Sequence, residues 1–429
     1  MRDLINLFEK MTLSIAFFLC MAFPLTLEAQ TLTLDEVNNL ARQNYPLIKQ
    51  KDLIRQTADI SIENLGKAHL PQITLSGQAS YQSDVTKVDV PIPGVTIPSP
   101  DKDQYKVIIA DLSQTIYDGG LIGEQKQLQR LTATVEDQKV EVELYKLQER
   151  VNQLYLSGLY LDAQIKQVAL IQEDFNNGIK QVQAQVKNGV ALRSNLDVLR
   201  AELLKTDQRL VELKASRKGL IEVLGLLTNQ NLDENVLLTK PAQQFFGGNE
   251  IKRPEVKLYS DQSKLLSQQQ QLINARTRPK ASLFVQGGYA KPGLNLFKNE
   301  FDWFYIGGIR VNWTLTGLYT SKKEKQLVNI NTRIIDLQKE TFILNTNTQL
   351  KQQQSEIEKL QQLIASDNEI IELRKSVKDA ARAQLENGVI TSNDYLREVN
   401  AEDQARQTLI THQLQLLQAQ INYQTILGK

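Results

Sequence analysis

Few residues of this 429-residue chain are of the types that carry out covalent or metal-based catalysis. The single cysteine is Cys20, and the only histidines are His69 and His412. All three methionines lie within the first 21 residues, so the rest of the sequence contains no sulfur. The composition therefore argues against zinc clusters, iron–sulfur centres, catalytic thiols and multi-histidine metal sites. We expect no cofactor.

Motifs for phosphate binding and nucleophilic attack are also missing from the sequence. It has neither a glycine-rich phosphate loop nor a nucleophile elbow. The segment Asp118-Gly119-Gly120 is typical of a turn from a strand into a helix. The 50 basic residues balance 49 acidic ones, so the net charge of +1 lacks the basic excess of a nucleic-acid-binding protein. The sequence thus predicts a protein that is not an enzyme, whose function depends on its architecture.

The first 29 residues have the layout of a secretory signal peptide. Arg2 and Lys10 precede an apolar run at Leu13–Leu27, which is shorter than the ~20 residues needed to span a bilayer. Ala29 then supplies a small residue for cleavage. A buried N-terminal helix is the alternative interpretation. No later stretch is apolar over the ~18 residues of a membrane helix, so we expect none.

The remaining chain consists of two copies of one plan. A shift of 208 residues places Pro71 on Pro279, and a shift of 199 residues places Asn188-Gly189-Val190 on Asn387-Gly388-Val389. Matches in the same order at two constant shifts indicate a duplication. Each copy reads as a helix, a β-hairpin and a long helical hairpin. The first repeat is predicted at 30–228, with its β-hairpin at 72–117 and its helical hairpin at 119–228. A linker or equatorial segment follows at 229–251. The second repeat is predicted at 252–429, with its β-hairpin at 281–316 and its helical hairpin at 318–428.

Alternating apolar and polar residues predict four β-strands with one apolar face. The predicted strands are 72–81, 105–117, 281–289 and 301–315. The ten steps from Trp303 to Trp313 cover about 33 Å along a strand. At a tilt of roughly 40° this distance spans about 25 Å, the height of the apolar band of an outer-membrane barrel. The predicted membrane-boundary aromatic residues are Tyr81, Tyr289, Phe301, Trp303, Tyr305 and Trp313.

Four strands are too few to close a barrel in a membrane. An open edge would leave backbone groups unpaired in lipid, and the smallest single-chain barrels have about eight strands. Several chains must therefore share one barrel, with two chains giving eight strands or three giving twelve. A soluble antiparallel sandwich is the alternative interpretation of the strands alone.

A long proline-free stretch follows the second strand of each copy. The first, at 119–187, would make a helix of roughly 100 Å at 1.5 Å per residue. It carries a coiled-coil seam at Val140, Leu144, Leu147, Val151, Leu154, Leu161, Ile165, Val168, Phe175, Ile179, Val182 and Val186. Asn-Gly ends the helix in both copies, because glycine suits the left-handed cap. We predict two antiparallel helical hairpins, the second at 318–386 and 393–427 with a weaker seam.

In this arrangement the chain resembles the TolC family of outer-membrane efflux proteins. The resemblance covers residues 31–428 and is carried by the signal peptide, the duplication, Leu70-Pro71-Gln72 before the first strand, Ile116-Tyr117-Asp118-Gly119-Gly120 after the second, and the two Asn-Gly-Val turns followed by Leu199-Arg200-Ala201 and Val399-Asn400-Ala401. It implies a mostly α-helical α+β membrane protein. Three chains would share a twelve-stranded β-barrel in the outer membrane and form an α-helical barrel in the periplasm.

The function implied by this resemblance is a passive exit duct for tripartite efflux or type I secretion. Its implied partners are two further copies of the chain, a periplasmic adaptor protein and an inner-membrane pump. Two other classes stay open: a secreted coiled-coil scaffold, and a periplasmic adaptor. Adaptors usually have one helical hairpin between the halves of small β-rich domains, whereas this chain has two. The sequence does not specify the cargo.

The resemblance also implies roles for residues at the two turns. The family's constriction uses aspartates six and nine residues after the second turn's glycine. Asp394 matches the first position, but Arg397 stands at the second, and Ile390 replaces a basic gate residue. We predict a gate formed by Asp394 with Arg397 nearby, and an N-cap role for Asp394 is the alternative. The predicted adaptor contacts are Asn188, Gly189, Val190, Arg193, Asn387, Gly388 and Val389.

Overall fold

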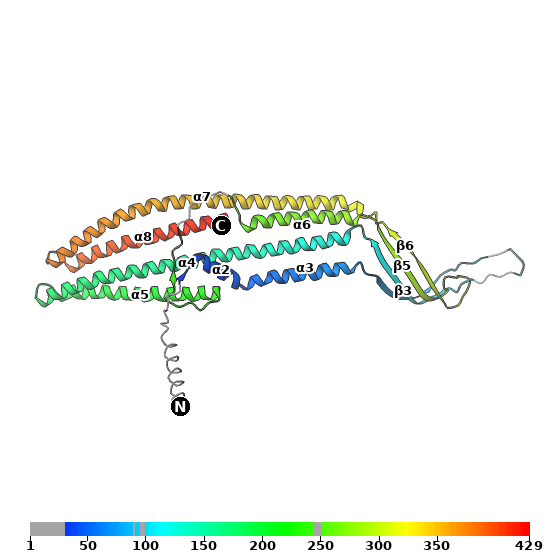
Figure 1. Ribbon diagram of the computed structural model, residues 1–429, viewed down its shortest axis with the longest axis horizontal. Helices are drawn as coiled ribbons and strands as arrows, with labels where there is room; N and C mark the ends of the chain where they lie inside the picture. The colour runs from blue at the N-terminus through cyan, green and yellow to red at the C-terminus, as the bar shows by residue number, and fades with distance from the viewer. Residues whose placement is uncertain (1–30, 89–90, 95–98, 243–249) are drawn as a thin grey trace, which may run out of the picture. The chain divides into compact units, whose positions relative to one another are not determined.

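The computed structural model describes residues 31–88, 91–94, 99–242 and 250–429 (Figure 1). The predicted signal peptide lies outside these residues. The chain forms two compact units, and each contains segments of both predicted repeats. One unit comprises Met1–Gln43, Arg150–Gln243 and Leu360–Gln418, and the other comprises Asn44–Glu149, Gln244–Lys359 and Ala419–Lys429.

Helices dominate the fold, as the sequence predicts. They are α2 (Leu34–Asn44), the 3-10 helix η1 (Pro46–Lys49), α3 (Gln50–Lys67), α4 (Leu121–Lys187), α5 (Arg193–Thr228), α6 (Pro254–Arg276), α7 (Gly317–Glu386) and α8 (Ser392–Leu427). The two predicted helical hairpins are confirmed as α4–α5 and α7–α8. Within the described residues, we find no helix with the length and apolar character needed to cross a membrane.

The main sheet contains four antiparallel strands in the order β2-β3-β5-β6. Their bounds are β2 (Gln72–Tyr81), β3 (Asp103–Tyr117), β5 (Lys280–Lys291) and β6 (Asp302–Asn312). The pairing of β3 with β5 joins the two predicted hairpins into one sheet, with Leu112 opposite Val285. Strands β2 and β6 each have only one partner in the chain, so both outer edges of the sheet are unpaired within the described residues.

Strand β6 is shorter than the predicted strand at 301–315. Its last paired residue is Asn312, opposite Lys280 at the start of β5. Pro279 precedes Lys280 and has no N–H to donate to a ladder, so Trp313 has no strand partner. The Trp313 indole instead donates a hydrogen bond of 3.0 Å to the carbonyl oxygen of Thr277. The prediction of strand structure at Phe301 and Trp313 was therefore wrong by one or a few residues at each end.

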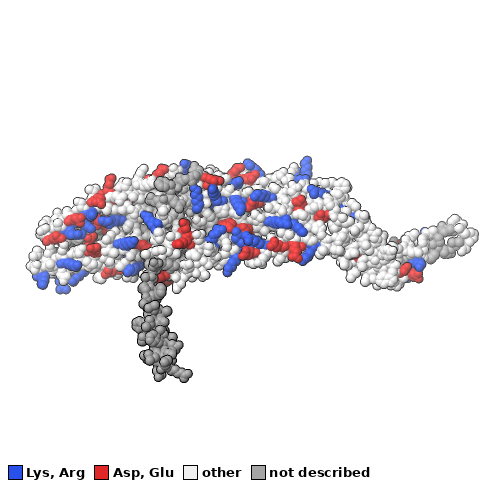
Figure 2. All heavy atoms as spheres, in the orientation of Figure 1, with Lys and Arg blue, Asp and Glu red and all other residues white. Residues whose placement is uncertain are grey.

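Apolar residues of the sheet share an exposed face. Ile73, Leu75, Ile309 and Val311 all lie on it and are largely exposed. Figure 2 shows the part formed by the strands as largely white, with one small group of charged side chains, whereas the helices of the same unit carry many. No described residue of the chain covers this face, and its apolar composition is typical of a surface that is buried against lipid or another molecule.

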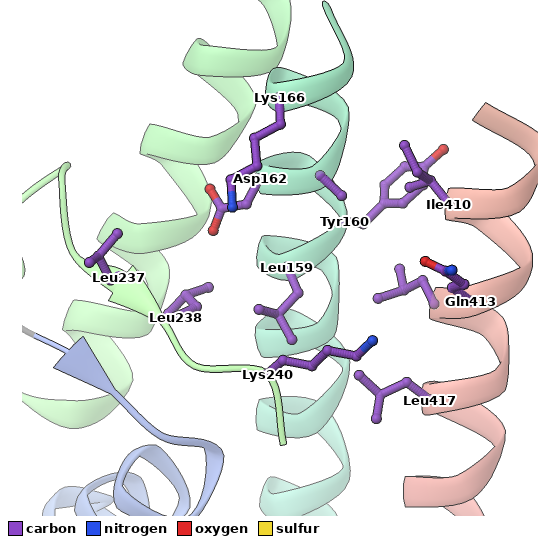
Figure 3. Close-up of a pocket in the computed structure, with 12 residues that line it drawn as sticks. Leu159, Tyr160, Asp162, Lys166, Leu237, Leu238, Lys240, Ile410, Gln413 and Leu417 are labelled. Atoms are coloured by element: carbon purple, nitrogen blue, oxygen red, sulfur yellow. The ribbon is translucent and has the colours of Figure 1, made fainter. Parts of the chain in front are cut away.

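A short second sheet, which the sequence analysis did not predict, lies in the other unit. Strands β1 (Thr31–Leu32) and β4 (Leu237–Leu238) pair in parallel. Residues 231–242, which include β4 and which we call the strap, run past α4, with Leu238 facing Leu159 (Figure 3). The buried Tyr155 hydroxyl of α4 lies 2.6 Å from the carbonyl oxygens of both Leu32, in β1, and Thr239, directly after β4. Its single proton can therefore be donated to either segment or shared between them.

Candidate functional site

The two helical hairpins turn with the same backbone geometry. Gly189 and Gly388 have φ angles of 72° and 69°, in the left-handed region that glycine adopts without steric cost. After α4, the Val190 N–H donates to the Gln185 carbonyl oxygen at 2.8 Å, and after α7 the Val389 N–H donates to Gln384 at 2.9 Å. These are Schellman caps, which satisfy the last carbonyl groups of each helix.

The predicted contact residues of both turns are exposed. Val190 and Val389 each have 70% of their surface accessible, which is unusual for valine in a folded chain. Asn188 and Asn387 are exposed beside them. Arg193 begins α5 and is also exposed, with only Asp197 near it at 4.0 Å. The structure thus places an exposed apolar side chain, an amide and a glycine at each turn, and the Asn387 amide donates to the Ala383 carbonyl oxygen at 2.8 Å.

Asp394 forms the N-terminal cap of α8 together with Thr391. The Thr391 N–H and hydroxyl donate to Asp394 Oδ2 at 3.1 and 2.7 Å, and the Asp394 N–H donates back to Thr391 Oγ1 at 3.3 Å. This reciprocal arrangement is a capping box. The hydrogen bonds from Thr391, with a smaller contribution from the charge of Arg397, lower the pKa of Asp394. The carboxylate is therefore ionised and held at the turn.

Arg397 points to a different partner. Its Nε donates to Glu398 Oε1 at 3.1 Å, and its side chain is 74% exposed. Glu398 in turn lies 3.8 Å from Arg374 of α7. Asp394 and Arg397 therefore lie on the same turn of α8 but bond to different partners, Asp394 to Thr391 and Arg397 to Glu398.

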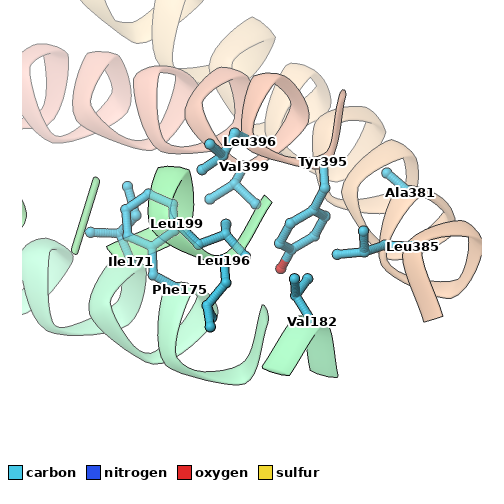
Figure 4. Close-up of a cluster of buried hydrophobic side chains, with 10 residues drawn as sticks. All are labelled: Ile171, Phe175, Val182, Leu196, Leu199, Ala381, Leu385, Tyr395, Leu396 and Val399. Carbon is cyan, nitrogen blue, oxygen red and sulfur yellow. The ribbon is translucent and has the colours of Figure 1, made fainter. Parts of the chain in front are cut away.

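A buried apolar cluster lies behind the two turns and joins the hairpins (Figure 4). Phe175 and Val182 come from α4, Leu199 from α5, and Tyr395 and Val399 from α8, and all are almost fully inaccessible. Val182 and Phe175 belong to the predicted coiled-coil seam, so part of that seam packs against the other repeat. The remaining members are Ile171, Leu196, Ala381, Leu385 and Leu396.

Close packing in this cluster depends on a glycine of α4. A Cβ atom at Gly178 would lie 3.1 Å from Tyr395 Cε1 and 3.6 Å from Leu199 Cδ1. The missing side chain at Gly178 makes room for the ring of Tyr395. The contact lets α8 approach α4 closely.

A network of charged residues borders the same helices. Lys378 of α7 lies 2.8 Å from both Asp174 of α4 and Glu402 of α8. Arg382 pairs with Asp174 at 2.6 Å, and Arg406 pairs with Glu402 at 2.5 Å. Lys378 and Glu402 are 9% and 4% exposed, so these charges are compensated inside the packed region.

The pKa values in this network are set by a balance of burial and pairing. Burial disfavours the charge on Lys378, but the hydrogen bonds to Asp174 and Glu402 outweigh it and raise the pKa of Lys378. Burial likewise opposes ionisation of Glu402, and its contacts with Lys378 and Arg406 lower the pKa of that carboxyl in spite of it. No sequence pattern predicted this network. Only the i,i+4 spacing of Glu402 and Arg406 on one helix was visible as a signal.

The predicted aromatic residues of the sheet differ in their surroundings. Tyr289 stacks on Phe301 with ring centres 5.4 Å apart and contacts Trp303 at 5.1 Å, and Tyr105, which was not predicted, lies 6.3 Å from Phe301. These rings form one cluster at the end of the sheet near the β5–β6 connection. Trp313, at the other end of β6, is held by Thr277. Tyr81 and Tyr305 are highly exposed.

The opposite face of the sheet carries polar contacts. Gln286 of β5 donates a hydrogen bond of 3.2 Å to Asp111 of β3. The guanidinium of Arg310 lies 4.4 Å above the ring of Phe284. The sheet therefore has one face of exposed apolar side chains and one face with charged and amide groups, which is the pattern of a sheet between lipid and water.

Comparisons with known proteins agree with this architecture. Residues 37–227 match a family model described as "Outer membrane efflux protein". These residues form an outer membrane efflux protein domain. The matched segment nearly coincides with the predicted first repeat, and the family interpretation made from the sequence is confirmed. Among proteins of curated function, no significant match was found.

Solved structures of outer-membrane channels share the fold of this chain. VceC from Vibrio cholerae is 14% identical, with a TM-score of 0.66 over 92% of this chain and 96% of its own. CmeC from Campylobacter jejuni is 12% identical, with a TM-score of 0.63 over 92% and 85%. MtrE from Neisseria gonorrhoeae, in its open state, is 15% identical, with a TM-score of 0.62 over 92% and 88%. The predicted fold class, long helical hairpins with a few antiparallel strands, is confirmed.

Proposed function

We propose that three copies of this chain form a passive exit duct in the outer membrane, without enzymatic activity of its own. The observation that carries the proposal is the four-stranded sheet, with an exposed apolar face and two unpaired edges. In lipid each edge needs a partner strand, and β6 of one copy beside β2 of the next supplies one. Three copies give twelve strands, and the long helices continue the duct into the periplasm.

The test is the mass of the protein extracted from outer membranes. We expect a particle of three chains by native mass spectrometry in detergent, with stepwise conductance in a planar bilayer. A monomer recovered in the soluble periplasmic fraction would contradict the proposal and favour a coiled-coil scaffold. The 429-residue chain has a mass of 48.7 kDa, and a protomer that has lost the predicted signal peptide is still heavy enough to separate two, three and four copies clearly.

We further propose that the two turns contact a periplasmic adaptor protein, which links the duct to an inner-membrane pump. The exposed Val190 and Val389 support this proposal, because each offers an apolar side chain beside a rigid glycine cap. Val190→Asp and Val389→Asp should each weaken capture of the adaptor by the purified trimer. Unchanged capture by the double variant, with the trimer intact, would exclude the turns as the contact.

For the gate, we propose that Asp394 carboxylates from three chains line the narrow end of the duct. Asp394→Asn removes the charge and keeps an oxygen that can accept from Thr391, whereas Thr391→Ala breaks the capping box and keeps the charge. We expect Asp394→Asn to raise conductance and reduce cation preference in planar bilayers, and Thr391→Ala to change neither. Equal effects of the two variants would leave Asp394 with a capping role alone. Arg397→Gln then measures how far its charge offsets that of Asp394.

A further inference from the structure

An open cavity of about 330 Å³ lies in the first unit between the middle of α4, the strap and α8 (Figure 3). Its volume falls at the lower end of the ~300–1,000 Å³ range typical of small-molecule sites. Its apolar walls come from all three elements, with Leu159 on α4, Leu238 on the strap, and Ile410 and Leu417 on α8. Nothing in the proposed channel function uses this cavity.

The walls of the cavity are fixed by contacts outside it. Leu238 packs so closely on α4 that a Cβ atom at Gly158 would lie 2.5 Å from Leu238 Cδ1. Arg217 of α5 donates to the carbonyl oxygen of Val236 at 2.6 Å and also to that of Glu234, and the Tyr155 hydroxyl holds Thr239. The strap is therefore tied down on both sides of Leu238. A ligand would find the site already formed, which lowers the entropic cost of binding.

The charges around the cavity are uneven. Lys166 and Lys240 line it, and neither ammonium group has an ion-pair partner among the described residues. The single carboxylate in the lining, Asp162, is neutralised by Arg217, whose Nε lies 2.5 Å from Asp162 Oδ1. The site thus combines an apolar floor with two exposed lysines: in Figure 3 the ammonium group of Lys166 lies on the Asp162 side of Leu159 and that of Lys240 on the α8 side.

We propose that this cavity binds a small amphipathic anion, a carboxylate with a single unbranched apolar tail. The tail would lie against the leucines of α4, the strap and α8. The exposed side chains of Lys166 and Lys240 would turn toward the mouth of the cavity to meet the carboxylate. A cavity of about 330 Å³ accommodates one short chain, so the proposed ligand is a free single-chain carboxylate rather than a two-chain phospholipid. The inference does not depend on the proposed trimer, because every lining residue belongs to one chain.

The experiment uses a thiol placed at the edge of the cavity. Cys20 is the only cysteine and lies in the predicted signal peptide, so Gln413→Cys introduces one reporter thiol, with the unsubstituted protein as background. The protein without its predicted signal peptide, in lipid nanodiscs, is treated with a maleimide in the presence of octanoate, octanamide or octylamine. Octanoate should slow the modification in a saturable way. At equal concentration octanamide and octylamine should slow it much less.

Removing the positive charges should then abolish the preference for the anion. Lys166→Gln and Lys240→Gln should each weaken octanoate protection by about tenfold or more, as expected for loss of a charged contact. Lys180→Gln, on an exposed part of α4 outside the cavity, should leave protection unchanged. Ala163→Phe, which fills the cavity without changing its charge, should remove protection.

Three results would overturn the proposal. The first is equal protection by octylamine and octanoate. The second is octanoate protection that survives the double substitution of Lys166 and Lys240. The third is a thiol that does not react even without octanoate, because a neighbouring copy would then cover the cavity. Circular dichroism of each variant verifies that the helices are intact.

Discussion

The apolar cluster behind the turns and the apolar face of the sheet contain similar side chains in opposite surroundings. Val182, Leu199 and Val399 are at most 1% exposed, whereas Ile309 and Val311 are 69% and 67% exposed. The cluster is completed by one chain, so its burial stabilises the isolated protomer. The apolar face of the sheet is not covered by described residues of the same chain, so its apolar residues add to stability only when lipid or another molecule covers them. One chain thus contains a self-sufficient part and a part that requires its environment.

The largest expected effect follows from emptying the cluster. Phe175→Ala should lower the free energy of unfolding by about 3–5 kcal/mol, because it leaves a cavity between three helices. Hydrogen exchange along α8 and thermal unfolding by circular dichroism would measure the loss. Leu204→Ala, at an exposed position of α5, is the control and should change stability by less than about 0.5 kcal/mol. Equal effects at the two positions would mean that α5 is also covered, by another molecule.

The sheet gives a second test through the two faces of β6. Ile309→Lys should cost about 2–4 kcal/mol if its face lies in lipid. Ile306→Lys makes the same chemical change on the opposite face and should be tolerated. The fraction of protein recovered as an oligomer from detergent-extracted outer membranes would report the difference. Equal recovery of both variants would contradict the assignment of the two faces.

Removing a charge from the network beside the cluster should lower the free energy of unfolding by a smaller amount. Lys378→Met removes the shared partner of Asp174 and Glu402, although Arg382 and Arg406 still compensate them. We expect a loss of about 1.5–3 kcal/mol, the contribution of a hydrogen bond to a charged group. Faster hydrogen exchange in both α7 and α8 would confirm that Lys378 ties them to α4. A change restricted to α7 would not.

The same network predicts a modest loss of stability in acid. The pKa of Glu402 is lowered in the folded chain, so its contribution is complete above the unfolded value of 4.5 and declines as pH falls through the folded value. The pKa of Lys378 is raised, so its contribution is lost only as the pH rises above 10.5. Melting temperatures at pH 3.5 and pH 7 would show the acid loss. Glu402→Gln should reduce the difference in melting temperature between pH 7 and pH 3.5. If the variant shows the same difference as the unsubstituted protein, the acid loss of stability comes from other carboxylates.

Local sequence signals predicted the elements well, because each is decided by nearby residues. Asn188-Gly189 and Asn387-Gly388 set the ends of α4 and α7, and alternation gave the strands to within a few residues. The sequence offered an N-cap role for Asp394, and the structure places Asp394 in the first turn of α8 with Thr391 as its capping partner. Cap assignments shift by one residue, because several neighbouring side chains can serve.

Contacts between distant segments were not predictable in the same way. The pairing of β3 with β5 joins hairpins that are far apart in the chain, and no local pattern specifies it. The contact of Lys378 with Asp174 crosses between repeats, so the sequence shows two charges without their relation. Strands β1 and β4 have two residues each, too few for any alternation to be recognised.

The parallel pairing of β1 with β4 has a consequence for the order in which the chain folds. Thr31 pairs with Leu237, so the amino-terminal strand has no template until more than 200 further residues have been synthesised. Closing so long a loop carries a large entropic penalty, which the α4–α5 hairpin reduces once it brings Tyr155 and the strap together. We therefore expect Thr31 and Leu32 to dock late in folding. The time at which their amide groups become protected from hydrogen exchange would then mark the completion of the first unit.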